Sequence, residues 1–204
     1  MALSKNQKRV VEDTIKNSLR NRFATYNPEP AVMPFHARLL GKDRLALYAF
    51  IHSLNTNFGT TIFEPVAISL SKGRFKSAER QVKSGTHIST AALFEIQRIM
   101  DDLTAGIRKP NKNEETEIIR GVCRKGEIRT VKPTMVDIFL ENNDGEIFLI
   151  DIKTAKPNKG GFKEFKRTLL EWTAAVLFEN PEKKVNTFIA IPYNPYEPKP
   201  YSRW

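Results

Sequence analysis

The chain has 204 residues, 40% of them hydrophobic and 27% charged, and a formal net charge of +10. This length suits one domain with a sizeable core, and the hydrophobic content is too high for a disordered chain. The excess of lysine and arginine favours a polyanionic partner, although ordinary surface charge explains it as well. Nucleic acid is better supported than a membrane, because no apolar run is long enough to span one.

The single cysteine, Cys123, cannot form an internal disulfide, which is consistent with a reducing compartment. The N-terminus lacks the apolar segment of a signal peptide. The three histidines are not spaced as metal ligands, so a zinc site is not expected.

The N-terminal half is predicted to be mainly helical. A helix capped by Ser4 and ending near Phe23 has an apolar stripe that repeats every four residues, expected either in the core or in a dimer interface. The stripe consists of Val11, Ile15, Leu19 and Phe23. A second helix is predicted over residues 43–54. Its expected buried side is Leu47, Tyr48, Ile51 and Leu54.

Residues 71–83 are strongly basic and are predicted to form a loop and a helix face. Five lysines and arginines stand there against one acid. A solvated surface and a phosphate-binding patch are equally good interpretations of this pattern. Arg74 and Lys76 are the candidate DNA contacts in this stretch.

The second half of the chain mixes helix and strand signals. A helix capped by Ser89 or Thr90 is predicted to reach Leu103, and residues 114–122 form a short helix or strand. A long helix is predicted over 162–178. The last strand, over 185–191, should then run parallel to the strand ahead of that helix, because the connection suits a right-handed crossover.

A β-hairpin is predicted around position 145. The runs 135–140 and 147–152 are β-rich and flank an Asn/Asp/Gly turn. Asp151 and Lys153 share one face of their strand because side chains alternate. A three-residue loop ending at Gly145 would place Asp137 opposite Asp151, with Cβ atoms roughly 5 Å apart. A two-residue loop would separate the two acids, and glycine at the left-handed third position favours the longer loop.

Two carboxylates this close repel each other unless a cation lies between them. Mg²⁺ is the natural candidate, since it prefers oxygen ligands and keeps several waters. Lys153 beside the metal could stabilise a phosphate or help to deprotonate a water. A metal, a water and a lysine are the groups that attack on a phosphodiester requires.

This arrangement resembles the PD-(D/E)xK nuclease superfamily, with Asp137 as the first acid, Asp151 as the second and Lys153 as the lysine. The chain departs from the motif at the proline, because Pro133 lies four residues before Asp137. The resemblance implies an α/β/α sandwich with a central mixed β-sheet, a restriction-endonuclease-like core, and a metal held at Asp137, Asp151 and Ile152. Mg²⁺ is the implied cofactor, and Mn²⁺ its substitute.

Within the superfamily, the chain is most similar to type II restriction endonucleases. The residues behind this likeness are Phe58 to Pro65 and Ile191 to Tyr196. The likeness implies a homodimer that cuts double-stranded DNA at a short specific site in the prokaryotic cytoplasm, with no role for a membrane. We expect one nuclease domain, with a helical part over 1–110, a catalytic core over 111–191 and a proline-rich aromatic arm over 192–204.

Many superfamily members carry a further glutamate that helps to hold the metal, and three candidates occur here. Glu64 stands in an otherwise apolar stretch, where a charge needs a reason, and it is the preferred candidate. A capping role at a helix start explains it nearly as well. Glu95 and Glu117 are interpreted as surface charges.

Positive charge gathers just after the candidate acids. Lysines near the start of the long helix oppose its dipole, which favours an anion nearby. The predicted DNA contacts in this region are Lys156, Lys159, Lys163, Lys166 and Arg167.

Two alternative functions stay open. One is a junction resolvase or repair nuclease of the same superfamily, and the other is a non-catalytic basic DNA-binding protein. The second has no use for two aspartates in apolar strands.

Overall fold

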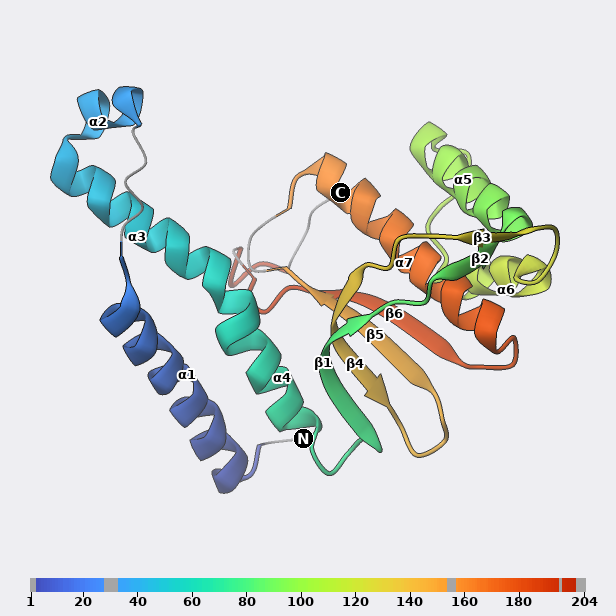
Figure 1. Ribbon diagram of the computed structural model, residues 1–204, viewed down its shortest axis with the longest axis horizontal. Helices are drawn as coiled ribbons and strands as arrows, with labels where there is room; N and C mark the ends of the chain where they lie inside the picture. The colour runs from blue at the N-terminus through green and yellow to red at the C-terminus, as the bar shows by residue number, and fades with distance from the viewer. Residues whose placement is uncertain (1–2, 28–32, 154–156, 195, 201–204) are drawn as a thin grey trace. The chain divides into compact units, whose positions relative to one another are not determined.

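The computed structural model describes residues 3–27, 33–153, 157–194 and 196–200 (Figure 1). The chain divides into two compact units, Met1–Leu70 and Ser71–Trp204. None of the helices within the described ranges combines the length and apolar character that a membrane span needs.

The first unit is helical, as predicted for this part of the chain. Its elements are α1 (Lys5–Thr25), α2 (Pro34–Leu40), α3 (Lys42–Phe58), a π-helical turn η1 (Gly59–Phe63) and α4 (Glu64–Ser71), which ends one residue beyond the unit. The predicted cap of α1 is confirmed. The Ser4 hydroxyl accepts the Gln7 N–H at 3.2 Å, and the Gln7 side chain accepts the Ser4 N–H at 3.0 Å.

The predicted burial of α3 is wrong. Leu47, Tyr48 and Ile51 are 59%, 49% and 48% exposed, and only Leu54 of the expected buried side is partly covered. The apolar stripe of α1 is likewise not a core, because none of the described residues of that helix is buried. The reason is that α3 packs mainly on α2 and η1, so this small helical unit has little interior in which to bury a full helix face.

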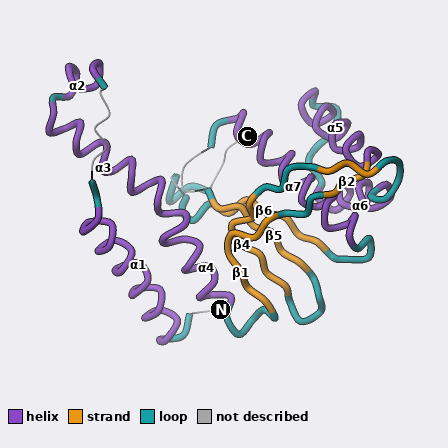
Figure 2. The backbone as a smooth tube through the Cα atoms, in the orientation of Figure 1, coloured by secondary structure: helices purple, strands orange, loops and turns teal. Residues whose placement is uncertain are grey.

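The second unit contains a four-stranded mixed sheet (Figure 2). Its strands are β1 (Ser77–Lys83), β4 (Met135–Glu141), β5 (Ile147–Ile152) and β6 (Val185–Ala190), in that spatial order. β4 is antiparallel to both of its neighbours, β1 and β5, and β6 is parallel to β5. A separate pair is formed by β2 (His87–Ser89) and β3 (Ile128–Thr130). The predicted mixed sheet and the parallel last strand are confirmed.

Helices cover one face of this sheet. α7 (Lys159–Glu179) connects β5 to β6 and packs on the sheet, and α5 (Thr90–Ala105) and α6 (Lys112–Val122) pack against α7. The side chains between these layers form the core. It includes Ile96, Ile99, Ile119, Val136, Leu149, Trp172 and Leu177. The Trp172 indole N–H donates to the Thr134 hydroxyl at 2.7 Å, which satisfies the one polar atom of that side chain.

The basic stretch 71–83 was predicted to form a loop and a helix face, but only residues 72–76 form a turn and residues 77–83 form strand β1. This strand forms one edge of the sheet and pairs with β4 from Ser77↔Glu141 to Lys83↔Met135. Edge strands tolerate charged residues on their exposed sides, so β1 lacks the apolar alternation that marks a strand in sequence. Its pairing with β4, a tertiary contact, decides its conformation.

The turn between β4 and β5 has the predicted three-residue loop. The Gly145 N–H donates to the Asn142 carbonyl at 3.1 Å, and the Asn142 N–H donates to the Glu146 carbonyl at 3.0 Å. Gly145 has a φ of +77°, in the left-handed region where glycine has no steric penalty.

We therefore expect Gly145→Ala to destabilise the protein by about 1–2 kcal/mol, the cost of a left-handed residue with a Cβ atom. A Cβ at this position would meet only ordinary contacts, so the loss would come from the backbone. Gly121→Ala is the matched control, because it lies inside α6 with open space around it and should stabilise the protein by about 0.5–1 kcal/mol. Thermal unfolding of both variants measures the difference. Equal effects would contradict this turn geometry.

Candidate active site

The two predicted acids face each other across β4 and β5. The last pairs of this ladder are Phe139↔Leu149 and Ile138↔Ile150. Continuing the same register places Asp137 opposite Asp151 on one face of the sheet, as the three-residue loop predicts. The turn at Gly145 thus sets the spacing of the two carboxylates.

Each carboxylate accepts a hydrogen bond from a residue at the end of β5 or directly after it. Oδ2 of Asp137 accepts the backbone N–H of Ile152 at 2.7 Å. The Nζ atom of Lys153 lies 2.8 Å from the Asp151 carboxylate, and it also lies 4.7 Å from the centre of the Phe165 ring on α7. The structure therefore brings together Asp137, Asp151 and Lys153, as the hairpin prediction requires.

Burial and the neighbouring acid both act on Asp137. Removal from water raises the pKa of the Asp137 carboxyl, and the negative charge of Asp151 raises it further. The Ile152 N–H and the Lys153 ammonium act in the opposite direction, and the net pKa is above its ordinary value. A cation between the two acids would remove the part of this pKa increase that comes from the charge of Asp151.

The donor set fits a hard divalent cation. The described ranges contain no group of three or more His, Cys, Asp and Glu side chains placed to hold a metal. Two carboxylates with the remaining positions left to water and a substrate phosphate are the arrangement that suits Mg²⁺. Asp137, Asp151 and Ile152 are the residues that would hold it. Their roles as metal ligands stay predictions.

Glu64 is buried at the start of α4, with a side chain only 2% exposed. Its carboxylate thus stands in the apolar setting that the sequence suggested. Glu64 belongs to the first unit, and its part in the site stays a prediction. Glu95 and Glu117 form ion pairs with Arg98 and Arg120 one helical turn away on α5 and α6. Glu117 is a surface charge, as predicted, whereas the Glu95 side chain is only 19% exposed.

The predicted DNA contacts on α7 differ in their surroundings. Lys163 is exposed near the start of the helix, and Arg167 donates to the Gln97 side chain at 2.6 Å. Lys166 instead pairs with Glu115, whose side chain is 1% exposed. The charge of Lys166 is therefore compensated inside the protein. Lys156 and the side chain of Lys159 lie outside the described residues.

The two predicted contacts ahead of the sheet are placed differently from each other. Arg74 lies in the turn between α4 and β1, where its N–H donates to the Ser71 carbonyl at 3.1 Å. Lys76 forms an ion pair of 3.5 Å with Glu141 at the end of β4. The Glu141 carboxylate also accepts a hydrogen bond from Lys183, which lowers the pKa of Glu141.

Sequence reasoning missed two residues. Glu115 is not among the candidates named from the sequence, although it stands four residues before the buried Ile119 and so on the buried face of α6. That spacing could have identified it. Gln81, on β1, donates from Nε2 to Oδ1 of Asp137 at 3.4 Å. No signal in the sequence marks this glutamine, because its role depends on the pairing of β1 with β4.

An apolar groove of about 410 Å³ adjoins the acids on the β6 side. Its lining includes Phe162, Ile189 and Tyr193. Ile189 is the Cα partner of Asp151 in the β5–β6 pairing. The Phe162 ring centre lies 6.2 Å from that of Phe165, the ring that the Lys153 ammonium contacts. Two lining residues therefore lie near the candidate site, although Asp137, Asp151 and Lys153 are not among the residues that line the groove.

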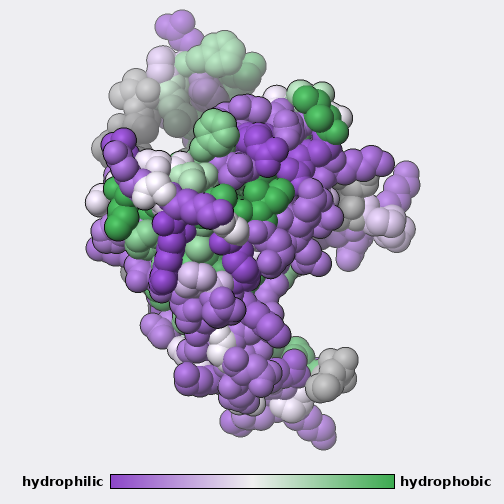
Figure 3. All heavy atoms as spheres, turned by 90° about the vertical axis from the view of Figure 1, so that its right-hand side faces the viewer, coloured by the Kyte–Doolittle hydropathy of each residue, from purple (hydrophilic) through white to green (hydrophobic). Residues whose placement is uncertain are grey.

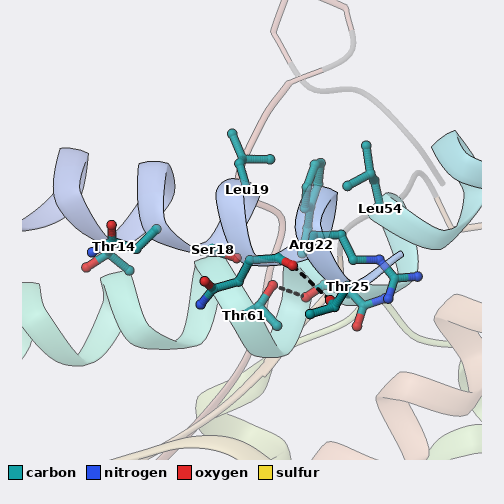
Figure 4. Close-up of a pocket in the computed structure, with 11 residues that line it drawn as sticks. Thr14, Ser18, Leu19, Arg22, Thr25, Leu54 and Thr61 are labelled. Atoms are coloured by element: carbon teal, nitrogen blue, oxygen red, sulfur yellow. Dashed lines mark hydrogen bonds between the residues drawn. The ribbon is translucent and has the colours of Figure 1, made fainter. Parts of the chain in front are cut away.

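A cavity of similar volume in the first unit has a different character (Figure 4). Polar side chains of α1, such as Ser18 and Arg22, face Thr61 of η1 across it. Its described lining contains no carboxylate, so this cavity lacks the groups needed to hold a divalent cation. The face of the molecule in Figure 3 is mostly hydrophilic, with hydrophobic residues in small separate groups.

Comparison with known proteins identifies the family of this chain. The model of the HinfI type II restriction endonuclease family matches residues 3–204. The type II restriction enzyme MjaII of Methanocaldococcus jannaschii is 31% identical over 216 residues, covering 97% of this chain and 56% of that protein. HgiEI of Herpetosiphon aurantiacus, also a type II restriction enzyme, is 27% identical over 165 residues, covering 80% of this chain and 59% of that protein.

The chain spans less than two thirds of the length of these curated relatives. No solved structure gives a significant match. The family model nevertheless covers nearly every residue, including the β4–β5 hairpin and all six strands. The chain belongs to the HinfI family of type II restriction endonucleases.

Proposed function

We propose that this protein is a divalent-metal-dependent endonuclease that hydrolyses phosphodiester bonds of double-stranded DNA at a short specific site. The main support for this proposal is that Asp137, Asp151 and Lys153 lie close together on one face of the hairpin. The names of the relatives, type II restriction enzymes, agree with it. The reducing cytoplasm of a prokaryote is the proposed place of action and suits the buried free thiol of Cys123.

The protein groups have distinct tasks in this reaction. A water attacks the phosphorus atom, and one P–O ester bond breaks. Mg²⁺, or Mn²⁺ in its place, would polarise the phosphate and lower the pKa of a bound water. Asp137 and Asp151 would hold the cation, and the Lys153 ammonium, 2.8 Å from Asp151, would contact the phosphate or pass a proton. The Phe165 ring limits the directions in which that ammonium can move.

DNA binding is assigned to the basic residues near the start of α7. Lys163, exposed near the start of α7, is the best-placed of the predicted contacts, and Arg167 follows it one turn later. An anion near this helix start would also interact favourably with the helix dipole. The net charge of +10 supplies attraction that does not depend on sequence.

A symmetric DNA site is cut most simply by two copies related by a two-fold axis. We assign the contact between copies to α2 and α3. Large hydrophobic side chains are exposed on these helices: Phe35, Leu39, Leu47, Tyr48 and Ile51. Contiguous exposed apolar side chains of this kind typically mark a protein interface.

The catalytic assignment predicts that Asp137→Ala, Asp151→Ala and Lys153→Ala each lower plasmid cleavage by at least about 100-fold, since each removes a metal ligand or a charge at the phosphate. Asp144→Ala is the matched control, because this carboxylate lies at the tip of the same hairpin. Incubation of wild type and variants with unmethylated plasmid and Mg²⁺, followed by mapping of the cut ends, measures the effect and gives the site.

The same assay tests the metal. Activity should require Mg²⁺ or Mn²⁺, whereas Ca²⁺ should support binding without cleavage, because its larger and looser coordination positions the water poorly. Wild-type cleavage by the Asp151 variant, or full activity in excess chelator, would overturn the endonuclease assignment. A preference for branched DNA over plain duplex would favour a junction resolvase.

Replacement of two lysines on α7 should affect different properties, DNA binding for Lys163 and protein stability for Lys166. Lys163→Met should leave stability within about 0.5 kcal/mol of wild type and reduce the salt dependence of DNA affinity by about one unit of slope. Lys166→Met should instead destabilise the protein by about 3–5 kcal/mol, because it leaves the Glu115 charge buried without its partner. The double variant Glu115→Gln/Lys166→Met should recover most of this loss. Unfolding curves and titrations at several salt concentrations separate the two effects, and equal stability of the two single variants would contradict the assignment.

The dimer assignment predicts that light scattering of wild type on a short duplex gives the mass of the duplex plus twice the monomer mass of 23.3 kDa. Leu47→Glu with Ile51→Glu should shift the protein to one copy per duplex, since two charges would then be buried at the contact. Phe94→Glu is the control, because Phe94 is an exposed aromatic residue on α5. One wild-type copy per duplex at every concentration would point to a monomeric nicking or repair enzyme.

A further inference from the structure

Gln81 has a backbone conformation that is unusual for its residue type. Its φ is +53°, and it is the sole residue other than glycine with a positive φ in the described part of the chain. A residue with a Cβ atom has a steric penalty in this left-handed region. A regular β-strand does not require a positive φ at any residue. A strained residue that persists inside a regular element points to a local function.

The strain lies directly opposite the first candidate acid. The β1–β4 ladder runs through Arg80↔Ile138 and resumes at Val82↔Val136, so Gln81 and Asp137 face each other where the ladder opens. The β4–β5 ladder, on the other side of Asp137, has its last pair at Ile138↔Ile150. The regular backbone pairing of β4 is thus interrupted at Asp137 on both sides.

Side-chain contacts replace the missing backbone pairing. The Gln81 amide donates to Oδ1 of Asp137 at 3.4 Å, and the Ile152 N–H donates to Oδ2 at 2.7 Å. The two donors come from opposite neighbouring strands and hold one oxygen each. The carboxylate plane cannot turn about its terminal torsion, which is otherwise broad, without losing one of these contacts.

We propose that Gln81 is a positioning residue that fixes the orientation of the Asp137 carboxylate for metal binding, and that the left-handed backbone at Gln81 is retained because it aims the side-chain amide at that carboxylate. This role rests on the proposed endonuclease function. Residues behind the ligands commonly orient them in this way, and losing one typically lowers metal affinity or activity about 10–100-fold.

Stability tests the backbone part of the proposal without any cleavage. Gln81→Ala removes the amide and keeps the penalty of a Cβ atom, whereas Gln81→Gly removes both. We expect the melting temperature of the glycine variant to exceed that of the alanine variant by about 2–4 °C. In an ordinary strand the order is reversed, because glycine is the less stable residue there. An alanine variant as stable as the glycine variant, or more stable, would overturn the left-handed geometry.

Metal binding tests the positioning part. Addition of Mn²⁺ should raise the melting temperature of wild type and raise it less in Gln81→Ala, Gln81→Gly and Gln81→Asn. Asparagine tolerates the left-handed region, but its amide is one methylene shorter and should not reach Asp137. The Mg²⁺ concentration for half-maximal plasmid cleavage should rise about 10–100-fold in all three variants, with DNA affinity in Ca²⁺ unchanged. Glu79→Gln, on the same strand, is the control and should behave as wild type.

The outcomes separate the two proposals. If wild type cuts DNA and the three Gln81 variants keep its Mg²⁺ requirement and its Mn²⁺ stabilisation, then Gln81 has only a structural role and the positioning proposal is wrong. If wild type leaves every plasmid intact and Mn²⁺ does not stabilise it, then the endonuclease function fails, and the positioning role fails with it.

Discussion

Repulsion between two aspartates is the constraint around which the second unit is arranged. A hairpin of this register puts Asp137 and Asp151 on one face of adjacent strands, where their charges disfavour each other. A single-residue change in loop length would end the conflict by sending one of them to the opposite face. The left-handed glycine at position 145 keeps the longer loop, so the turn maintains an arrangement that is electrostatically unfavourable without a cation.

The surrounding residues reduce this repulsion but do not remove it. Lys153 pairs with Asp151, and the Ile152 N–H binds Asp137. Even so, the pKa of Asp137 stays above its ordinary value, with burial as the larger cause and the neighbouring acid as the next. A fold that needed only stability would replace such a pair with apolar residues, as it does with the adjacent pair Ile138↔Ile150 on the same strands. The retained acids therefore favour a role in binding a cation over a role in folding.

The sequence predicted those features that depend on neighbouring residues. The hairpin register follows from turn chemistry, and the cap of α1 and the helix between β5 and β6 follow from local periodicity. Sequence reasoning failed where tertiary contacts decide the outcome. The charged strand β1 is held by its pairing with β4, and the apolar side of α3 is exposed because its unit offers little interior to cover it. The contact of Gln81 with Asp137 spans two strands that are more than fifty residues apart in sequence, so no local pattern could reveal it.

The same distinction applies to the positive charge. The composition gives the net charge and suggests a polyanionic partner, but it does not say which cations face that partner. On α7, Lys163 and Lys166 are three residues apart and look equivalent in sequence. The structure separates them, because Lys166 reaches the buried Glu115 while Lys163 is exposed. Pairing leaves the net charge of the protein unchanged but confines the field of Lys166 to the interior between α6 and α7. Any attraction for a phosphate backbone would then come from exposed residues such as Lys163, and the positively charged surface is smaller and more localised than the composition implies.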